Sequence, residues 1–386
     1  MIERAILRTA AKSLAQYGVL CITGPRQSGK ASLSKRLCRN KPYIDFENPA
    51  IQAQALMNIE NFLRPYKQGA ILNEVQHVPD LLHYLQVLLN KGNKRGPFVL
   101  TGSNNFLLQE KISQSLAGRA GYISLLPLSY AELKHNHRGE DNLLKYILAG
   151  GYPEIWQEKL KPRIWMNRYI QTYVQRDVRL LKNITNMAAF SRFLYLCANY
   201  VGQILNRDEL ARKVGVDTKT ILSWLDVLEN SYIIYLLKPW HNNLNKRILK
   251  SPKLYFYDTG LLCSLLGIST TIHLKKHQAY AAIFENWIMS EVKKNNFNRG
   301  IQEGMYYFRD SAGNEIDLVY ERDGQPVAIE IKANKKITTD MFSGIKYWQK
   351  NNNNQYSQSI LLYGGNHTKI VDEKLSILTW KDVADI

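Results

Sequence analysis

The sequence has 386 residues, of which 45% are hydrophobic and 22% charged, the composition of an ordinary globular protein with length for two or three domains. No apolar run approaches the roughly 18 residues of a membrane span, and the charged N-terminal segment lacks the cleavage site of a secretory signal. The four cysteines are scattered and form no C-x-x-C pair, which predicts reduced thiols in a cytoplasmic protein.

The net charge of +18 is unevenly distributed along the chain. Residues 1–150 contain 19 basic and 10 acidic side chains, residues 151–250 contain 16 and 8, and residues 251–386 contain 16 and 15. A basic middle region predicts a polyanion partner, with DNA as the first candidate. A soluble basic surface without a specific partner is the alternative.

The first 130 residues alternate between short apolar runs and segments with helical spacing. Residues 18–24, 42–48, 69–78 and 96–108 are typical of strands, whereas residues 1–18, 30–40 and 78–92 are typical of helices. This alternation predicts an α/β domain with a mostly parallel sheet.

The segment GPRQSGKASL, residues 24–33, lies between the first of these strands and the helix that follows it. It fits the pattern G-x-x-x-x-G-K of a loop whose backbone N–H groups bind nucleotide phosphates, with a helix N-terminus adding positive potential. A chance glycine-rich turn is the alternative. The predicted nucleotide-binding residues are Gly24, Pro25, Arg26, Gln27, Ser28, Gly29, Lys30, Ala31 and Ser32.

The other half of such a site lies at the ends of two later strands. An ATPase of this type usually has an aspartate that supports the metal ion and often a glutamate that activates water. Here Asn73 stands in the place of the aspartate, and Glu74 remains. Thr101 and Ser103 are candidate sensors of the outer phosphate. Arg119 is a candidate arginine finger acting in trans in a homo-oligomer, and a structural salt bridge is its alternative role.

An ordered series of segments resembles a known family over the whole length of the chain. The sequence resembles the AAA-superfamily ATPases of bacteria and archaea that carry a C-terminal domain of unknown function. The resemblance implies an AAA-type P-loop domain and a C-terminal nuclease-like fold. Members usually read G-K-T-T at the loop and D-E at the second strand, and this chain departs at Ala31 and at Asn73. The segments that carry the resemblance are GPRQSGKASL, ILNEVQHVPDLLHYLQ, FVLTGSNNFLL, SLAGRAGYISLLPLSYAEL, GGYPE and YIQTYVQRDVRLL.

Both departures concern the magnesium ion of a bound nucleotide. Without the hydroxyl at position 31 and the carboxylate at position 73, the ion would be held mainly by phosphates and water. Ser32 could substitute in part, although it points in another direction on the helix. The sequence therefore predicts that ATP or ADP binds with little dependence on Mg²⁺, and that hydrolysis is weak or absent.

Residues 207–240 resemble a winged helix, the first helix ending near Gly215 and the second capped by Asp217. Lys219, Thr220 and Ser223 would then face the major groove of DNA. A role as a protein-binding module is the alternative. The apolar positions with helical spacing are Leu210, Val214, Ile221, Leu225 and Leu228, and the basic and aromatic residues expected near phosphates are Trp240, Lys246, Arg247, Lys250, Lys253 and Tyr255.

The last third contains the signature of a PD-(D/E)-x-K nuclease. Asp317 is expected at the polar turn of a strand, and Glu330 and Lys332 lie two residues apart on another strand, so they face the same side. Asp317 and Glu330 are predicted metal ligands, and the helix before them offers Glu285 or Glu291, with Glu291 taken as the third. A charged hairpin, or a nuclease fold without activity, is the alternative.

The predicted architecture has four parts: an AAA-type P-loop domain over residues 1–135, connecting helices over 136–187, a winged helix over 188–268, and an α/β nuclease-like domain over 269–386. The predicted function is nucleotide binding on or near DNA, without contact with a membrane. Two alternatives remain open, a metal-dependent DNA nuclease regulated by nucleotide and a nucleotide-gated scaffold without enzymatic activity.

Overall fold

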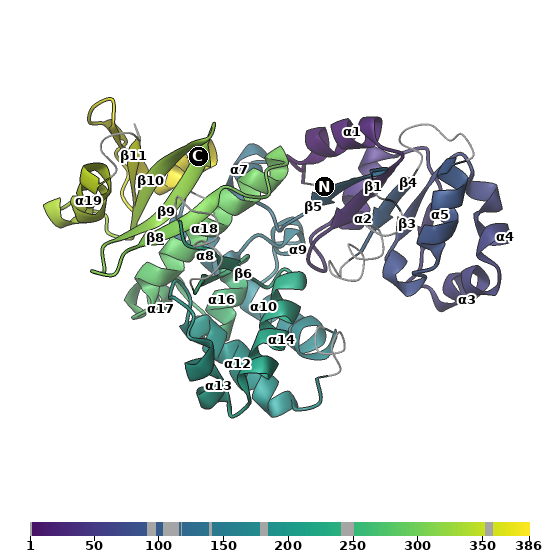
Figure 1. Ribbon diagram of the computed structural model, residues 1–386, viewed down its shortest axis with the longest axis horizontal. Coiled ribbons are helices and arrows are strands. Elements are labelled where there is room, and N and C mark those ends of the chain that lie inside the picture. Colours follow the sequence, from purple (N-terminus) through teal and green to yellow (C-terminus); the bar gives the residue numbers. More distant parts are fainter. Residues whose placement is uncertain are drawn as a thin grey trace. The chain divides into compact units, whose positions relative to one another are not determined.

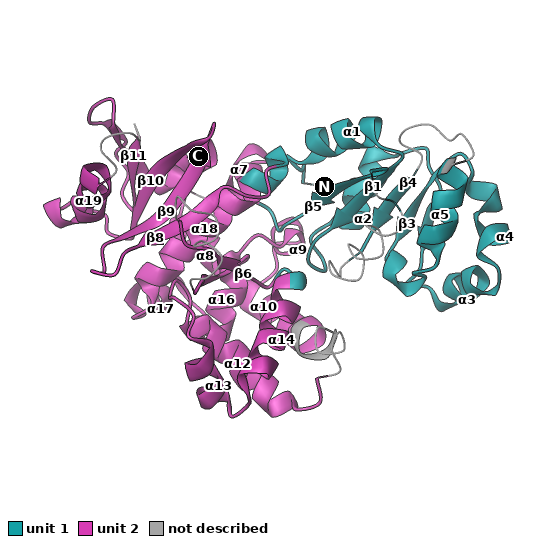
Figure 2. Cartoon of the chain, viewed as in Figure 1, with its two compact units in different colours: residues 1–128, 230–232, 296–300 teal, residues 129–229, 233–295, 301–386 magenta. Residues whose placement is uncertain are grey.

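The structure is a computed structural model that describes residues 2–90, 98–102, 116, 118–138, 141–177, 184–240, 251–351 and 358–386. The chain divides into two compact units, the first made of residues 1–128, 230–232 and 296–300, and the second of the remaining residues (Figure 2). Among the helices described, none has the length and apolarity to cross a lipid bilayer.

Unit 1 is built on a five-stranded parallel sheet with the strand order β2-β3-β4-β1-β5 (Figure 1). The predicted parallel sheet is therefore confirmed, and β1 lies inside it between β4 and β5. The strands are β1 (Val19–Thr23), β2 (Tyr43–Asp45), β3 (Ala70–Asn73), β4 (Phe98–Thr101) and β5 (Ala120–Ser124), and the helices are α1 (Leu7–Gln16), α2 (Lys30–Leu37), α3 (Pro49–Met57), α4 (Ile59–Leu63), η1 (Arg64–Tyr66), η2 (Val75–His77) and α5 (Leu81–Asn90).

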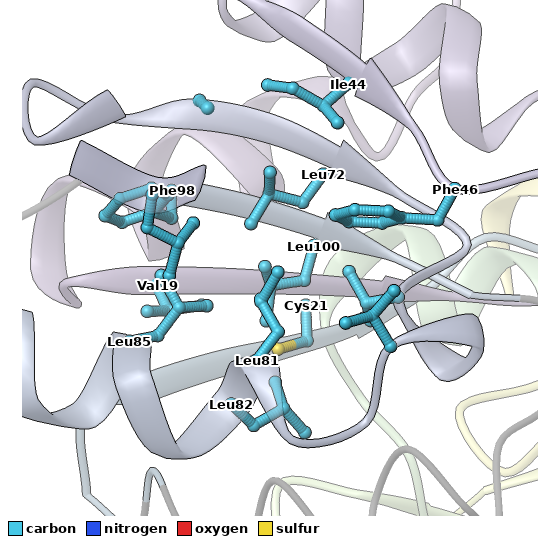
Figure 3. Packing of buried hydrophobic residues seen from close by; sticks show 14 of the residues in the cluster. Val19, Cys21, Ile44, Phe46, Leu72, Leu81, Leu82, Leu85, Phe98 and Leu100 are labelled. Atoms are coloured by element: carbon cyan, nitrogen blue, oxygen red, sulfur yellow. The ribbon is translucent and has the colours of Figure 1, made fainter. Parts of the chain in front are cut away.

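Alternate residues of each central strand belong to two separate cores. Val19 and Cys21 of β1 face one core with Leu81 and Leu85 of α5 (Figure 3). Leu20 and Ile22 enter the opposite core, where Leu33 of α2 also lies. A strand that is buried on both faces must be apolar at every position, which explains the uninterrupted run in the sequence. The sheet is thus covered by helices on both faces.

Unit 2 combines a helical part, a two-stranded hairpin and a six-stranded mixed sheet with the order β12-β13-β11-β10-β9-β8. Its first helices are α7 (Tyr130–His135), α8 (Leu143–Ala149), α9 (Pro153–Gln157), α10 (Pro162–Tyr169), the π-helix η3 (Ile170–Asp177) and α12 (Met187–Asn199). The hairpin region comprises α13 (Arg207–Val214), α14 (Thr218–Asn230), β6 (Ile234–Leu237) and β7 (Lys253–Phe256), followed by α16 (Thr259–Leu265), α17 (Thr271–Lys276) and α18 (Tyr280–Arg299). The last residue of α14 and the last four residues of α18 belong to unit 1. The sheet region comprises β8 (Met305–Arg309), β9 (Glu315–Arg322), β10 (Gln325–Lys332), η4 (Thr339–Phe342), α19 (Ser343–Asn351), β11 (Ser359–Tyr363), β12 (Lys369–Ile370), β13 (Leu375–Thr379) and η5 (Trp380–Asp385).

The helices α13 and α14 follow the periodicity read from the sequence. The five apolar positions predicted from helical spacing are all buried, and Gly215 ends α13 in the left-handed conformation with φ of 81°. Asp217 caps α14 by accepting a hydrogen bond from Thr220 N at 2.7 Å. The hairpin β6–β7 then pairs in antiparallel register. The interpretation of this region as a winged helix stays a prediction.

Candidate functional site

The phosphate loop lies between β1 and α2, in the strand–loop–helix setting that phosphate binding requires. Gln27 and Gly29 have positive φ angles of 62° and 97°, so the backbone turns back on itself before the helix begins. A Cβ atom at Gly24 would lie 2.2 Å from the carbonyl oxygen of Leu125. Only glycine allows β1 to end this close to its neighbour.

Lys30 opens α2 and folds back over the loop. Its Nζ donates to the carbonyl oxygens of Gly24 at 3.1 Å and Pro25 at 2.9 Å. Burial lowers the pKa of Lys30, and the negative charge of Glu74 opposes this change. The ammonium group therefore lies where phosphate oxygens could replace these two carbonyls as its acceptors.

Arg4 supports the loop from the N-terminal segment, and the sequence carried no signal for this role. Its guanidinium donates to the carbonyl oxygens of Ser28 and Leu126, both at 2.7 Å, and the residue is buried. Because Leu126 follows β5, this one side chain ties the loop to the neighbouring strand.

The strand ends of β2, β3 and β4 meet in a hydrogen-bonded chain. Asn73 Nδ2 donates to Asp45 Oδ1 at 3.0 Å, and Asn73 Oδ1 accepts from Thr101 Oγ1 at 2.6 Å. Thr101 Oγ1 in turn accepts from Glu74 N at 3.3 Å. Since the Thr101 hydroxyl has a single proton and gives it to Asn73, it has none left to donate to a phosphate. The expected sensor role of Thr101 does not fit this arrangement.

Three further residues were predicted for this site: Glu74, Arg119 and Ser103. Glu74 has left-handed backbone with φ of 54°, and its Oε2 accepts from Gln76 Nε2 at 2.5 Å. Arg119 is exposed and precedes β5, at the amino end of the parallel strands. The phosphate loop follows the carboxyl end of β1, so within one subunit Arg119 cannot reach the phosphates. Ser103 lies outside the described residues.

Positions 31 and 73, which support the magnesium ion of a nucleotide in the usual pattern, do not fit a directly held Mg²⁺ here. Ala31 has no ligand atom, and Ser32 is exposed. Both ends of the Asn73 amide are engaged, one by Asp45 and the other by Thr101. Within the described part of the chain, no three His, Cys, Asp or Glu side chains are arranged to hold a metal ion.

A second cluster of charged side chains lies in unit 2, where the nuclease signature was predicted. Lys332 Nζ lies 2.6 Å from Glu330 Oε1 and 3.7 Å from Asp317 Oδ2. The three predicted residues therefore lie together, although Asp317 is the third residue of β9 and not part of a turn. Glu330 Oε2 is buried without a hydrogen-bond partner in the described structure, and burial together with the charge of Asp317 raises the pKa of Glu330 to about 7.

Lys253 joins this cluster, which corrects its expected role in binding DNA phosphates. Its side chain is 3% exposed, its Nζ lies 3.8 Å from Glu285 Oε1, and it forms a closer ion pair with Glu315. Tyr255 is also buried, donating to Glu285 Oε1 at 2.5 Å. Neither residue is available to DNA. The residues Lys246, Arg247 and Lys250 lie outside the described residues.

The helix α18 contributes Glu285 to the cluster, while Glu291 is engaged elsewhere. Glu291 pairs with Lys294 at 2.8 Å and accepts from Tyr130 N at 2.5 Å. The expectation that Glu291 would be a metal ligand therefore does not fit its contacts. Burial and the charge of Asp317 raise the pKa of Glu285 to about 7, so Glu285 interacts electrostatically with the cluster.

Residues 16–134 match the model of a family described as an AAA domain. Residues 140–271 and 280–383 match two models, each described as a domain of unknown function.

Similar proteins have been found in mycobacteria and other microorganisms. The uncharacterized protein Rv2008c of Mycobacterium tuberculosis is 31% identical over 325 residues, which cover 83% of this chain and 71% of that protein. An uncharacterized protein of Haemophilus influenzae is 24% identical over 361 residues, covering 83% and 84% of the two chains. Among solved structures, the Walker-type ATPase PABY2304 of Pyrococcus abyssi is similar with a TM-score of 0.45 and 15% identity, over 68% of this chain and 94% of that one.

Proposed function

Because this chain belongs to the same family as Rv2008c of M. tuberculosis and has an AAA domain with a P-loop ATPase fold, we propose that it binds ATP or ADP and hydrolyses ATP weakly or not at all. The loop Gly24–Lys30 and the first turn of α2 bind the phosphates. When bound, Mg²⁺ would stabilise the charge that develops during phosphoryl transfer.

One observation supports the impaired hydrolysis above all. The amide of Asn73, in the position where the family usually has an aspartate, is engaged at both ends by Asp45 and Thr101. Phosphate binding depends on other groups, namely the backbone N–H groups of the loop and Lys30. Binding and hydrolysis therefore separate at this site, and magnesium contributes only modestly to nucleotide affinity.

A calorimetric titration with ADP and with ATP, in EDTA and in Mg²⁺, tests this proposal. We expect binding in both conditions, and we expect Lys30→Ala to abolish it, because this change removes the ammonium group that reaches the phosphates. Lys12→Ala, on the exposed surface of α1, is the control and should bind as the wild type does. Equal affinity of Lys30→Ala and wild type would reject the phosphate loop as the binding site.

A metal-dependent nuclease is the second candidate function, and the convergence of Asp317, Glu330 and Lys332 supports it. The buried, unpartnered Oε2 of Glu330 could accept a ligand. Two observations oppose it: Lys332 already pairs with Glu330 and Asp317, and the pKa of Glu330 is raised to about 7 by burial and the charge of Asp317, so this carboxyl is only partly ionised at neutral pH. We therefore favour a nuclease-like fold without cleavage.

Incubation of plasmid and single-stranded DNA with the protein in Mg²⁺ or Mn²⁺ decides between the two possibilities. An active nuclease would lose cleavage in Asp317→Ala and Lys332→Ala while keeping most of its affinity for DNA, since these residues would act in chemistry. We expect no cleavage by the wild type under either metal.

A further inference from the structure

The carboxylate missing from β3 is present on the adjacent strand. Asp45 ends β2 and is the in-register partner of Asn73, which ends β3. The distance of 3.0 Å between Asn73 Nδ2 and Asp45 Oδ1 shows that the two side chains lie side by side. The partners also determine the orientation of the amide, whose nitrogen must face the carboxylate and whose oxygen must face the Thr101 hydroxyl.

Contacts of the phosphate loop place this end of β2 beside the nucleotide site. Glu47 N donates to Asp45 Oδ1 at 3.1 Å, and Arg26 of the loop forms an ion pair with Glu47 at 3.2 Å. Although burial lowers the pKa of Lys30, the negative charges of Glu74 and Glu47 act in the opposite direction. The acidic end of β2 and the ammonium of the loop therefore share one electrostatic environment.

We propose that Asp45 supplies the carboxylate for the magnesium ion that the family usually places at position 73, and that Asn73 is the neutral side chain that orients it. This inference rests on the proposed nucleotide binding. Asp45 is only half-buried, so its carboxylate can interact with a hydrated ion. The remaining influence of magnesium on nucleotide affinity comes from Asp45.

The same geometry explains why position 73 is an amide. An aspartate there would bring two carboxylates to hydrogen-bond distance of each other and would remove the donor that Asp45 now accepts from. Like charges this close oppose ionisation of both groups, and one of them takes up a proton or a cation. Asp45 and Asn73 thus form a matched pair: the negative charge lies on Asp45 of β2, and the neutral amide lies on Asn73 of β3.

The variants Asp45→Asn, Asn73→Asp and the exchange Asp45→Asn/Asn73→Asp test the proposal. The first readout is the ratio of ADP affinities in Mn²⁺ and in EDTA, measured by calorimetry. We expect a modest ratio for the wild type, a ratio of one for Asp45→Asn, and a restored ratio for the exchange. Asp80→Asn removes the same charge at an exposed position and should leave the ratio unchanged.

The second readout is the melting temperature of the ligand-free protein in EDTA at neutral pH. Asn73→Asp should lower it, because it brings two carboxylates into contact, and the exchange should rescue it. This readout needs no nucleotide, and it shows whether each variant folds.

Two results distinguish the failure of this inference from the failure of the proposed function. Wild-type affinity for ADP with an unchanged metal ratio in Asp45→Asn overturns the role of Asp45 and leaves nucleotide binding intact. The absence of any ADP binding by the wild type, with or without Mn²⁺, overturns both. An Asn73→Asp variant as stable as the wild type at neutral pH overturns the matched pair.

Discussion

At the nucleotide site, two side chains differ from the usual pattern of a P-loop ATPase, and their neighbours decide what each difference means. Ala31 removes a hydroxyl from the first turn of α2, and no described contact there replaces it. Asn73, by contrast, belongs to a hydrogen-bonded chain with Asp45 and Thr101. The first change is a simple loss, whereas the second is compensated by the adjacent strand.

Restoring the missing hydroxyl should therefore increase ATP hydrolysis, and returning the carboxylate from β2 to β3 should add to the gain by placing it where P-loop ATPases usually have it. Ala31→Thr with Asn73→Asp should release phosphate faster than either single variant, because both side chains support one ion and such effects are rarely additive. Adding Asp45→Asn should improve the stability of this variant by removing the carboxylate pair. Phosphate release measured under saturating ATP checks this expectation.

Glu74→Gln in the restored background is the matching control and should remove the gain, since Glu74 is the residue proposed to activate water. A wild-type protein that already turns over on the order of 1–100 times per second would contradict the impaired site.

At the level of elements, the acidic cluster of unit 2 brings together charged side chains from strands and a helix that are far apart in the sequence. β9 and β10 bring Asp317 beside Glu330 and Lys332, and Asp317 Oδ2 accepts from Ile331 N at 2.8 Å. The helix α18 adds Glu285, and β7 adds Lys253. Buried carboxylates without enough cations stay protonated at a higher pH than exposed ones.

The cluster should make the stability of the protein depend on pH. The pKa of Glu330 is raised from its ordinary value of 4.5 to about 7, so between these values the folded state binds more protons than the unfolded state. The contribution of Glu330 to stability therefore falls as the pH rises from about 4.5 to about 7. Glu330→Gln should reduce the loss of unfolding free energy between pH 5 and pH 8 by about 2 kcal/mol.

Urea unfolding at these two pH values measures the effect. Glu373→Gln, at an exposed position, should retain the pH dependence of the wild type. Identical pH dependence in Glu330→Gln and wild type would show that Glu330 does not titrate in this range.

At the scale of the whole molecule, the uneven charge remains the reason to expect a polyanion. Residues 151–250 contain 16 basic and 8 acidic side chains, the highest net positive charge per residue of the three parts. Residues 1–150 contain 19 and 10 over a longer stretch, whereas residues 251–386 are nearly neutral. Lys253 is one basic residue fewer that could contact DNA phosphates, because it is buried in an ion pair with Glu315. The exposed Lys219 at the start of α14 remains available.

DNA binding through this region should weaken steeply with salt, with a log–log slope of roughly −0.9 per phosphate neutralised. Charge reversal at Lys246, Arg247 and Lys250 should lower the affinity and flatten the slope, while ADP binding stays unchanged. Fluorescence anisotropy with labelled duplex DNA over a series of salt concentrations measures both quantities.

Reversal of three exposed lysines in the C-terminal part, Lys335, Lys336 and Lys346, gives a control with the same change in net charge. An equal loss of affinity in this control would mean that net charge alone governs binding. Binding that does not respond to salt would favour the scaffold function.

The local pattern of the sequence was sufficient to predict helices and strands, and to predict which residues close in the sequence face the same side. Apolar runs with glycine at the end predicted β1 and the loop after it, because a strand buried on both faces has no polar position. Strand periodicity placed Glu330 and Lys332 on one side of β10, and in the structure Lys332 Nζ lies 2.6 Å from Glu330 Oε1. Helical spacing likewise identified the buried positions of α13 and α14.

Only the tertiary structure decided which distant residues complete each site. Asp45 lies beside Asn73 because β2 is next to β3 in the sheet, and sheet order cannot be read from periodicity. Arg4 reaches the loop across the end of β5, and Lys253 reaches Glu285 from another element. Spacing along the chain determines which side of an element a residue faces, whereas the partner on that side depends on how the elements pack.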